Sequence, residues 1–174
     1  RYMTLTEQDM TFLARQFPDI IDQVTTSVSK SGFAVTYKKK HFSDMYLNGT
    51  FPAQADMNHI QVLSGRFINN LDIAQKRKVM VITHLLAKNL LEGSTDYQTL
   101  IGKKIKVGNL VFTIIGVRHA YENRNDRELY IPYTTARSIF GMTNDLDLIA
   151  FTFNGLETEA ENEAFELRLK KILN

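Results

Sequence analysis

The sequence predicts a mixed α+β fold, because stretches with helical periodicity and stretches with strand periodicity follow one another along the chain. Residues 10–17 place apolar side chains at helical spacing, residues 104–107 alternate between lysine and aliphatic residues, and residues 78–83 form a compact apolar run. The first pattern puts one apolar face on a helix, and the second puts one on a strand. With 174 residues, the chain is long enough to bury a real core.

Composition and charge exclude several classes of protein. The chain carries 21 Lys and Arg against 19 Asp and Glu, a net charge of +2, whereas nucleic-acid binding requires a basic excess on one face. Without cysteine it forms neither a disulfide framework nor a thiolate site. No apolar run reaches the length of a membrane span, and the polar opening RYMTLTEQDM lacks the apolar core of a signal peptide. Because the chain opens on Arg1, we expect a fragment of a longer protein.

The N-terminal segment is expected to form one helix followed by strands. Thr6 and Asp9 have the spacing of a capping box at the start of this helix. Pro18 should end it, since proline disfavours helical geometry at the residue before it. Residues 20–51 are then rich in β-branched and aromatic residues, which predicts a meander of about three strands.

Two polar segments are expected as turns of this meander, Ser31-Gly32 and residues 38–41. The second contains the run Lys38-Lys39-Lys40, which is a candidate patch for phosphate or for a membrane surface. We favour the simpler interpretation of this run, a solvated strand end or hairpin tip.

Later elements alternate in the same way. In order we expect a short helix at 52–58, a strand at 59–65, a polar turn or short helix at 69–76, a buried strand at 78–83 and a helix at 84–91. After a hairpin at 100–117 come a strand at 128–132, a helix at 133–140 closing at Gly141, a strand at 146–153 and a terminal helix from Glu157 with an apolar stripe of Phe165, Leu169, Ile172 and Leu173. Acidic residues at the start of this last helix suit its positive end.

The hairpin LIGKKIKVGNLVFTIIGV, residues 100–117, invites a phosphate-binding interpretation, because glycine and lysine are the residues of a P-loop. The spacing does not fit. Gly93 lies too far before Gly102, and Lys104 stands where Ser or Thr should bind magnesium.

A scaffold interpretation of the hairpin fits better. Gly108-Asn109 suits a tight turn, because positive φ angles cost little there. Ile105 and Val107 would face the core while the lysines between them face water. Gly116 would relieve crowding where the second strand bends or meets another backbone.

No catalytic constellation is visible in the sequence. The four histidines, at positions 41, 59, 84 and 119, show no metal-binding spacing. A GxSxG serine motif is absent, and Asp145 and Asp147 fit ordinary solvation better than acid–base work. The sequence therefore predicts no catalytic residue, no metal site and no cofactor.

The most polar segment is YENRNDREL, residues 121–129. One interpretation is a solvated loop. The other is a contact surface for a partner, with Tyr121, Arg124 and Arg127 as its anchors, because aromatic residues and arginine dominate interface energies. The sequence leaves both interpretations open.

Several segments between residues 60 and 136 carry a resemblance to a known family. They are VLSGRFINNLD at 62–72, KVMVIT at 78–83, the helix after it, the hairpin at 100–117 and ELYIPYTTA at 128–136. Taken in this order, they resemble the extracytoplasmic core domain of MacB-like and FtsX-like ABC transporter permeases. The motif positions that we assign to the scaffold are Gly65, Arg66, Gly102, Gly116 and Pro132, with Asp72 as the acidic residue downstream of Arg66.

The resemblance implies a two-lobed periplasmic domain of mixed α+β class. A porter-like lobe would be assembled from residues 1–57 and 145–174, and a smaller α/β lobe at 58–144 would be inserted between these two parts. Such domains lie between the first and second transmembrane helices of the permease. The segment would then be the extracytoplasmic part of a bacterial inner-membrane protein.

The same resemblance implies a non-catalytic function, the transmission of conformational change across the membrane, with contact to cargo or to a periplasmic adaptor protein. ATP hydrolysis would belong to a cytoplasmic ATP-binding domain or subunit. A second permease copy would complete a dimeric transporter. Efflux, lipoprotein release and cell-wall regulation all use related scaffolds, and the sequence does not separate them.

Two other classes stay open. A stand-alone module that binds a small ligand or peptide predicts an apolar pocket with convergent polar groups. A hydrolase or transferase of unfamiliar type predicts perturbed carboxylates or histidines clustered in one cleft.

Overall fold

The computed structural model describes residues 12, 15–17, 21–121, 126–141, 148–153 and 159–173 of the chain. Contacts within the chain divide it into two compact units. Unit 1 consists of Arg1–Thr26 and Asn144–Asn174, and unit 2 consists of Ser27–Thr143. Unit 2 is thus one continuous segment inserted into unit 1.

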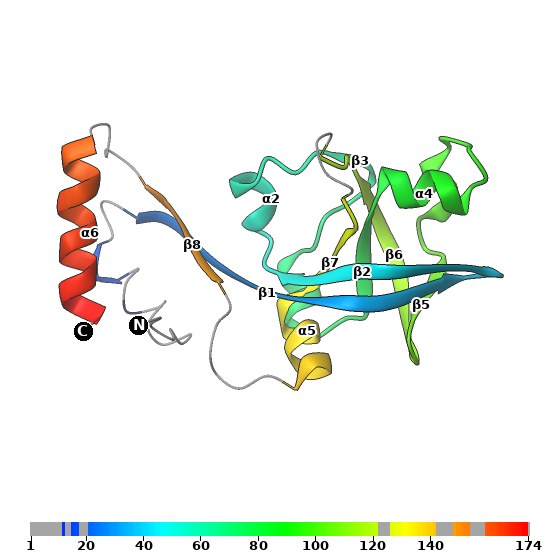
Figure 1. The fold of residues 1–174 in the computed structure, drawn as a ribbon, viewed down its shortest axis with the longest axis horizontal. Coiled ribbons are helices and arrows are strands. Elements are labelled where there is room, and N and C mark those ends of the chain that lie inside the picture. The colour runs from blue at the N-terminus through cyan, green and yellow to red at the C-terminus, as the bar shows by residue number, and fades with distance from the viewer. Residues whose placement is uncertain are drawn as a thin grey trace. The chain divides into compact units, whose positions relative to one another are not determined.

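Strands and short helices alternate through unit 2, as the sequence predicts (Figure 1). The elements of unit 2 and of the β1 strand that enters it are β1 (Ile21–Tyr37), β2 (Lys40–Thr50), α2 (Gln54–Met57), β3 (Val62–Gly65), α3 (Asn70–Ala74), β4 (Val79–Thr83), α4 (His84–Leu90), the 3-10 helix η1 (Tyr97–Leu100), β5 (Lys104–Val107), β6 (Leu110–Arg118), β7 (Glu128–Pro132) and α5 (Tyr133–Phe140). Unit 1 contains β8 (Leu148–Phe153) and α6 (Glu159–Leu173). No helix in these described ranges is long and apolar enough to cross a membrane.

The strands of unit 2 form a mixed sheet whose pairing closes on itself. The order is β2, β7, β4, β6, β5 and β1, and β1 pairs back with β2. β2–β7 and β4–β6 are parallel neighbours, whereas β1–β2 and β5–β6 are antiparallel. β3 pairs with β6 outside this path. Closed pairing protects most strand edges from water and from other chains.

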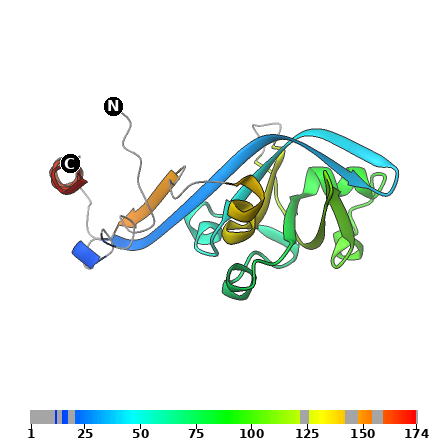
Figure 2. The same ribbon diagram turned by 90° about the horizontal axis from the view of Figure 1, so that it is seen from below.

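The first two strands form one long hairpin instead of the expected meander of three strands. Figures 1 and 2 both show β1 and β2 running side by side to its tip. Ser31-Gly32 makes no turn: Gly32 has a φ of 83°, and the register shifts on either side of Phe33, which is the geometry of a β-bulge. The turn falls at Lys38-Lys39, and both lysines are exposed, so the predicted hairpin tip is confirmed.

The core lies inside this sheet. β4 is buried along its whole length, and Ile105 and Val107 of β5 are buried while Lys104 and Lys106 are exposed, as their alternation predicts. α5 packs against β2 and ends at Gly141, whose φ of 63° is the left-handed conformation that ends many helices. The predicted elements of unit 2 from residue 52 onward are all present.

Unit 1 has a small aromatic contact of its own. Phe165 of α6 is buried and meets the ring of Phe17 edge to face, with ring centres 5.1 Å apart. The guanidinium of Arg168 lies 5.2 Å from the centre of the Phe17 ring. The predicted cap at Thr6 and Asp9, Pro18, Asp145, Asp147 and Glu157 lie outside the described residues, as do the side chains of Leu169, Ile172 and Leu173.

The two compact units and the lobes expected from the family have different extents, and the expected lobes stay a prediction. The second boundary, after Thr143, lies next to the expected one after residue 144. The first falls after Thr26 and not after residue 57, because β1 pairs with β5 and β2 pairs with β7, which ties the hairpin to unit 2. The porter-like character of the discontinuous lobe stays a prediction.

Candidate functional site

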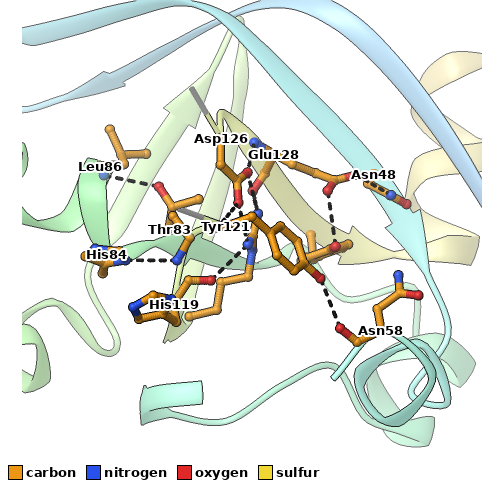
Figure 3. A network of polar contacts seen from close by, with 12 residues as sticks. Asn48, Asn58, Thr83, His84, Leu86, His119, Tyr121, Asp126 and Glu128 are labelled. Carbon is orange, nitrogen blue, oxygen red and sulfur yellow. Dashed lines mark hydrogen bonds and ion pairs between the residues drawn. The ribbon is translucent and has the colours of Figure 1, made fainter. Parts of the chain in front are cut away.

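The most connected polar site of unit 2 surrounds Arg118, at the end of β6 (Figure 3). Its buried guanidinium donates to both carboxylate oxygens of Asp126, from Nη1 at 2.8 Å and from Nη2 at 2.7 Å. It also donates to the carbonyl oxygens of His119 at 3.1 Å and Glu128 at 2.8 Å. Asp126 accepts further bonds from the amides of Tyr121 and Glu128, both at 3.1 Å. The pair therefore fastens both ends of the connection between β6 and β7.

Strand alternation explains why an arginine points inward here. The buried row of β6 runs through Phe112, Ile114 and Gly116 to Arg118. Because Arg118 is the last residue of the strand, its aliphatic stem stays in the core while its charged head reaches the carbonyl groups at the end of the sheet.

The ion pair stays charged despite its burial. Burial acts to raise the pKa of the Asp126 carboxyl, but the hydrogen bond and charge of Arg118 and the two amide bonds outweigh burial and hold the pKa below its usual value. For Arg118, burial acts to lower the pKa, and the bond to Asp126 raises it above its usual value. Of the three nitrogens of this guanidinium, Nε finds no hydrogen-bond partner among the described residues.

Further polar groups connect the site to β2 and β7. Asn48 donates to one Glu128 carboxylate oxygen at 2.6 Å, and the Tyr130 hydroxyl donates to the other at 3.1 Å. Burial first, and then the charge of Glu128, raise the pKa of Tyr130 well above its usual value. The Arg118 guanidinium lies 5.0 Å from the centre of the Tyr130 ring and 5.6 Å from that of Tyr121, which adds cation–π attraction.

Two of the three predicted partner contacts are described, and both lie at this site. Tyr121 is 43% exposed, and its hydroxyl donates to the carbonyl of Asn58 at 3.1 Å. Arg127 Nη1 lies 3.7 Å from Asp44 Oδ2. Arg124 lies outside the described residues. The predicted contact segment is therefore held at both ends while an aromatic side chain stays open to solvent.

A hollow of about 360 Å³ opens beside Arg127. β2 and α4 supply most of its walls, and Asp126 and Arg127 complete it. On its α4 side Leu85 is 41% exposed. The hollow thus gives the exposed end of the site a concave neighbour with a mixed, mainly polar lining.

A histidine pair is the part of the site that the sequence did not reveal. His84 and His119 stack, with ring centres 4.7 Å apart and planes inclined by 24°. The Nδ1 of His84 accepts a hydrogen bond from the amide of Ala120 at 2.9 Å. The two residues meet because β4 and β6 are parallel and in register, Thr83 opposite Arg118, so that each histidine follows the end of its strand. That parallel pairing was the only signal from which the pair could have been inferred.

We expect unit 2 to lose stability as the pH falls through the pKa of His84. Burial first, and then the charge of His119, lower this pKa below its usual value of 6.5. The unfolded chain then takes up the proton first, so the contribution of His84 is complete above 6.5 and is lost as the pH falls through the folded-state pKa. The Asp126 carboxyl titrates lower, because its pKa is lowered from 3.8.

Denaturant unfolding at a series of pH values between about 7 and 5 measures this effect. In the His84→Asn variant, the amide oxygen of asparagine can accept the hydrogen bond from the Ala120 amide in place of Nδ1. Asparagine does not titrate, so the stability of this variant should change less over this pH range. Equal pH slopes for the variant and the unaltered chain would contradict the assignment to His84.

The family-motif residues build the scaffold next to the site. Arg66 donates from Nη1 to Asp72 Oδ2 at 2.6 Å and from Nη2 to Oδ1 at 3.1 Å, and Asp72 is fully buried. Asp72 also caps α3 together with Asn69. At Gly65 an added Cβ would lie 2.1 Å from the carbonyl oxygen of Ile115, so only glycine allows this approach.

The other three motif residues also act through the conformation or the packing of their backbone. Gly102 adopts a φ of 85°, which glycine reaches without strain. Pro132 ends β7 with a φ of −59° and precedes α5. Gly116 lies against the backbone of Arg66, as its predicted role in relieving crowding requires.

Within the described part of the chain, the charged groups of the site are engaged with one another and with the backbone. No group of three or more His, Asp or Glu side chains there could hold a metal ion. The hydrogen-bonding capacity of Asp126 is occupied by Arg118 and by backbone amides. The described site thus combines a closed sheet with a β6–β7 connection that is anchored at both ends.

The chain belongs to the MacB-like periplasmic core domain family, which matches residues 1–171. This confirms the family that the motifs predicted, and it makes the chain the periplasmic domain of a MacB-like ABC transporter permease. The macrolide export ATP-binding/permease protein MacB of Rhodospirillum rubrum is 33% identical over 95 residues, which cover 52% of this chain and 14% of that protein.

Solved structures show the same fold. The periplasmic region of MacB from Actinobacillus actinomycetemcomitans superposes with a TM-score of 0.80 at 22% identity, over 99% of this chain and 76% of that one. The extracellular domain of the noncanonic ABC-type transporter YknZ from Gram-positive bacteria gives 0.72 at 25% identity, over 92% and 78%. A domain of a permease protein from Porphyromonas gingivalis gives 0.66 at 16% identity, over 99% and 73%. The predicted mixed α+β class is confirmed.

Proposed function

We propose that this domain is a non-catalytic relay of an ABC transporter, which passes conformational change across the membrane and contacts cargo or a periplasmic adaptor protein. One observation carries the proposal: the buried pair of Arg118 and Asp126 fastens the 119–128 connection to the sheet, while Tyr121 at its start stays 43% exposed. The residues at both ends of this connection are held by these contacts, so they lose little conformational entropy when the segment binds.

The architecture supports the relay. The chain enters and leaves through unit 1, and unit 2 is inserted as one continuous segment. In our proposal unit 1 corresponds to the porter-like lobe and continues into membrane helices of a bacterial inner-membrane permease. Motion driven by ATP would then reach the two lobes as a rigid-body shift.

The relay needs partners. We propose a cytoplasmic ATP-binding domain or subunit, a second permease copy and a periplasmic adaptor protein. The name of the R. rubrum relative joins ATP-binding and permease functions in one protein, which supports the first of these. Tyr121, Arg124 and Arg127 are the proposed contacts for cargo or adaptor.

Removing two of these contacts tests the proposal. In the complete transporter, Tyr121→Ala with Arg127→Ala is expected to weaken adaptor binding by about 10-fold or more, because an aromatic residue and an arginine are typical anchors of an interface. Transport should fall while ATP hydrolysis continues. Pull-down with the purified adaptor, transport and ATPase assays measure the three quantities.

Tyr97→Ala with Arg137→Ala removes the same residue types elsewhere in unit 2 and serves as the matched control. Unfolding midpoints of both double variants show whether either change acts through stability. If the Tyr121 and Arg127 variant binds and transports like the control, the contact surface lies elsewhere.

A further inference from the structure

A second hollow, of about 500 Å³, lies at the tip of the β1–β2 hairpin, away from the residues around Arg118. The hairpin lines it with Tyr37 and the three lysines that follow, and the end of α4 lines it with Leu90, Leu91 and Glu92. Two distant parts of unit 2 therefore form its walls. Figure 1 shows α4 beside the hairpin.

Lys40 joins the two walls. Its Nζ donates to the carbonyl oxygens of Asn89 at 2.8 Å and Leu90 at 3.4 Å, and it lies 3.4 Å from Glu92 Oε1. These carbonyls belong to the last turn of α4, where the partial negative charge of a helix collects. Lys40 thus caps the helix, neutralises the acidic residue of the lining and keeps the hollow in shape.

Lys38 and Lys39 are left facing the hollow with their charge uncompensated. Both side chains are exposed, and neither makes an ion pair with any residue that the structure describes. The Nζ of Lys38 lies 5.4 Å from the centre of the Tyr37 ring, which keeps one ammonium next to an aromatic surface. Two adjacent ammonium groups without a counter-charge form a site for an anion.

Apolar groups lie close to these charges. Tyr37 and Leu90 are only 7% and 5% exposed, so they form a firm floor, and Leu91 is partly exposed above it. An inorganic anion would gain nothing from this apolar surface, and a neutral apolar molecule would gain nothing from the lysines. The lining fits a molecule that carries both kinds of group.

The charge of the whole unit favours the same class of ligand. Unit 2 holds 16 of the 21 Lys and Arg but 8 of the 19 Asp and Glu, so 16 minus 8 gives it a net charge of +8. Such an excess raises the local concentration of anions within about one Debye length, ~8 Å at physiological ionic strength.

We propose that this hollow is a binding site for an anionic amphiphile. The phosphate or carboxylate head pairs with Lys38 and Lys39, and the acyl or aromatic part lies on Tyr37, Leu90 and Leu91. The site is separate from the Tyr121 surface, so it stands or falls independently of the proposed partner contact.

Calorimetric titration of the whole chain with lysophosphatidylglycerol below its micelle-forming concentration tests the proposal. We expect saturable binding that weakens as salt is added. Lys38→Glu with Lys39→Glu should weaken it by about 10-fold or more, since each charge-assisted contact contributes about that factor. Lys76→Glu with Lys78→Glu makes the same change of charge at exposed positions elsewhere in unit 2 and should leave the affinity within about 2-fold.

Leu91→Gln tests the apolar part of the site and should also weaken binding. Circular dichroism of each variant checks that it is folded. Inorganic phosphate carries the anionic group alone, and dodecyl maltoside carries an apolar chain without charge. If either bound as tightly as the lysophospholipid, one kind of group would be sufficient for binding and the proposal would be overturned. Binding only to phosphatidylglycerol vesicles would point to a membrane surface, and equal losses in both lysine variants would point to net charge alone. Either result would also overturn it.

Discussion

Replacing Asp126 by asparagine is expected to lower the free energy of unfolding by about 3–5 kcal/mol, because the change leaves the Arg118 charge buried without a counter-charge. The side chains of Arg118 and Asp126 are 1% and 4% exposed, so water cannot take the place of the carboxylate. Asparagine has a single acceptor oxygen, and its amide group would face a guanidinium nitrogen that also donates. The amides of Tyr121 and Glu128 would lose their charged acceptor as well.

Denaturant unfolding of the whole chain measures this loss. Asp44→Asn is the matched control, since it breaks a pair with Arg127 in which the Asp44 side chain is 75% exposed, and it should change stability by at most about 1 kcal/mol. Replacing both partners, Arg118→Met with Asp126→Leu, should recover part of the loss, because no buried charge then remains. A cost for Asp126→Asn no larger than that of Asp44→Asn would show that the pair does not hold the connection.

The same substitution links stability to the proposed function. If the pair orders the connection between β6 and β7, Asp126→Asn should also weaken adaptor binding, although Asp126 itself is buried. A loss of stability without any loss of binding would separate the scaffold role from the contact role.

Local patterns made much of unit 2 predictable. The alternation of Lys104, Ile105, Lys106 and Val107 describes a strand with one covered face, and that is how these residues lie. The apolar run at 79–83 is a buried strand for the same reason. Such patterns depend only on the backbone period and on burial, so they need no knowledge of the neighbours.

The site was harder to predict, because its pairs form across the sheet. Asp126 lies in the most polar segment of the sequence, where a charged residue suggests a solvated loop, yet its carboxylate is buried against Arg118. His84 and His119 looked scattered, and only the parallel register of β4 and β6 brings them together. Gly32 was expected in a turn, because glycine adopts a positive φ without strain. It does adopt a positive φ, but within a β-bulge of β1, which requires the same conformation.

Gly116→Ala is expected to destabilise unit 2 by about 3 kcal/mol or more, or to prevent folding, because a Cβ there would lie 2.1 Å from the carbonyl oxygen of Arg66. The obstacle is backbone and not a flexible side chain, so no rotamer change can relieve it. β3 would have to move away from β6, where Gly65 is paired opposite Gly116. That movement would carry Arg66 away from buried Asp72 and so disturb a second ion pair.

Gly102→Ala separates this clash from the usual cost of replacing glycine. Nothing lies within 4 Å of an added Cβ at Gly102, but its φ is +85°, so this variant should lose only about 1 kcal/mol. Unfolding of both variants, or their soluble yields if Gly116→Ala does not fold, compares the two costs. Similar losses would mean that β3 yields readily and that the close approach of β3 and β6 is dispensable. A much larger loss at Gly116 would show that the close backbone contact between β3 and β6 requires glycine at this position. The motif glycine would then have a structural role in the scaffold and no role in binding.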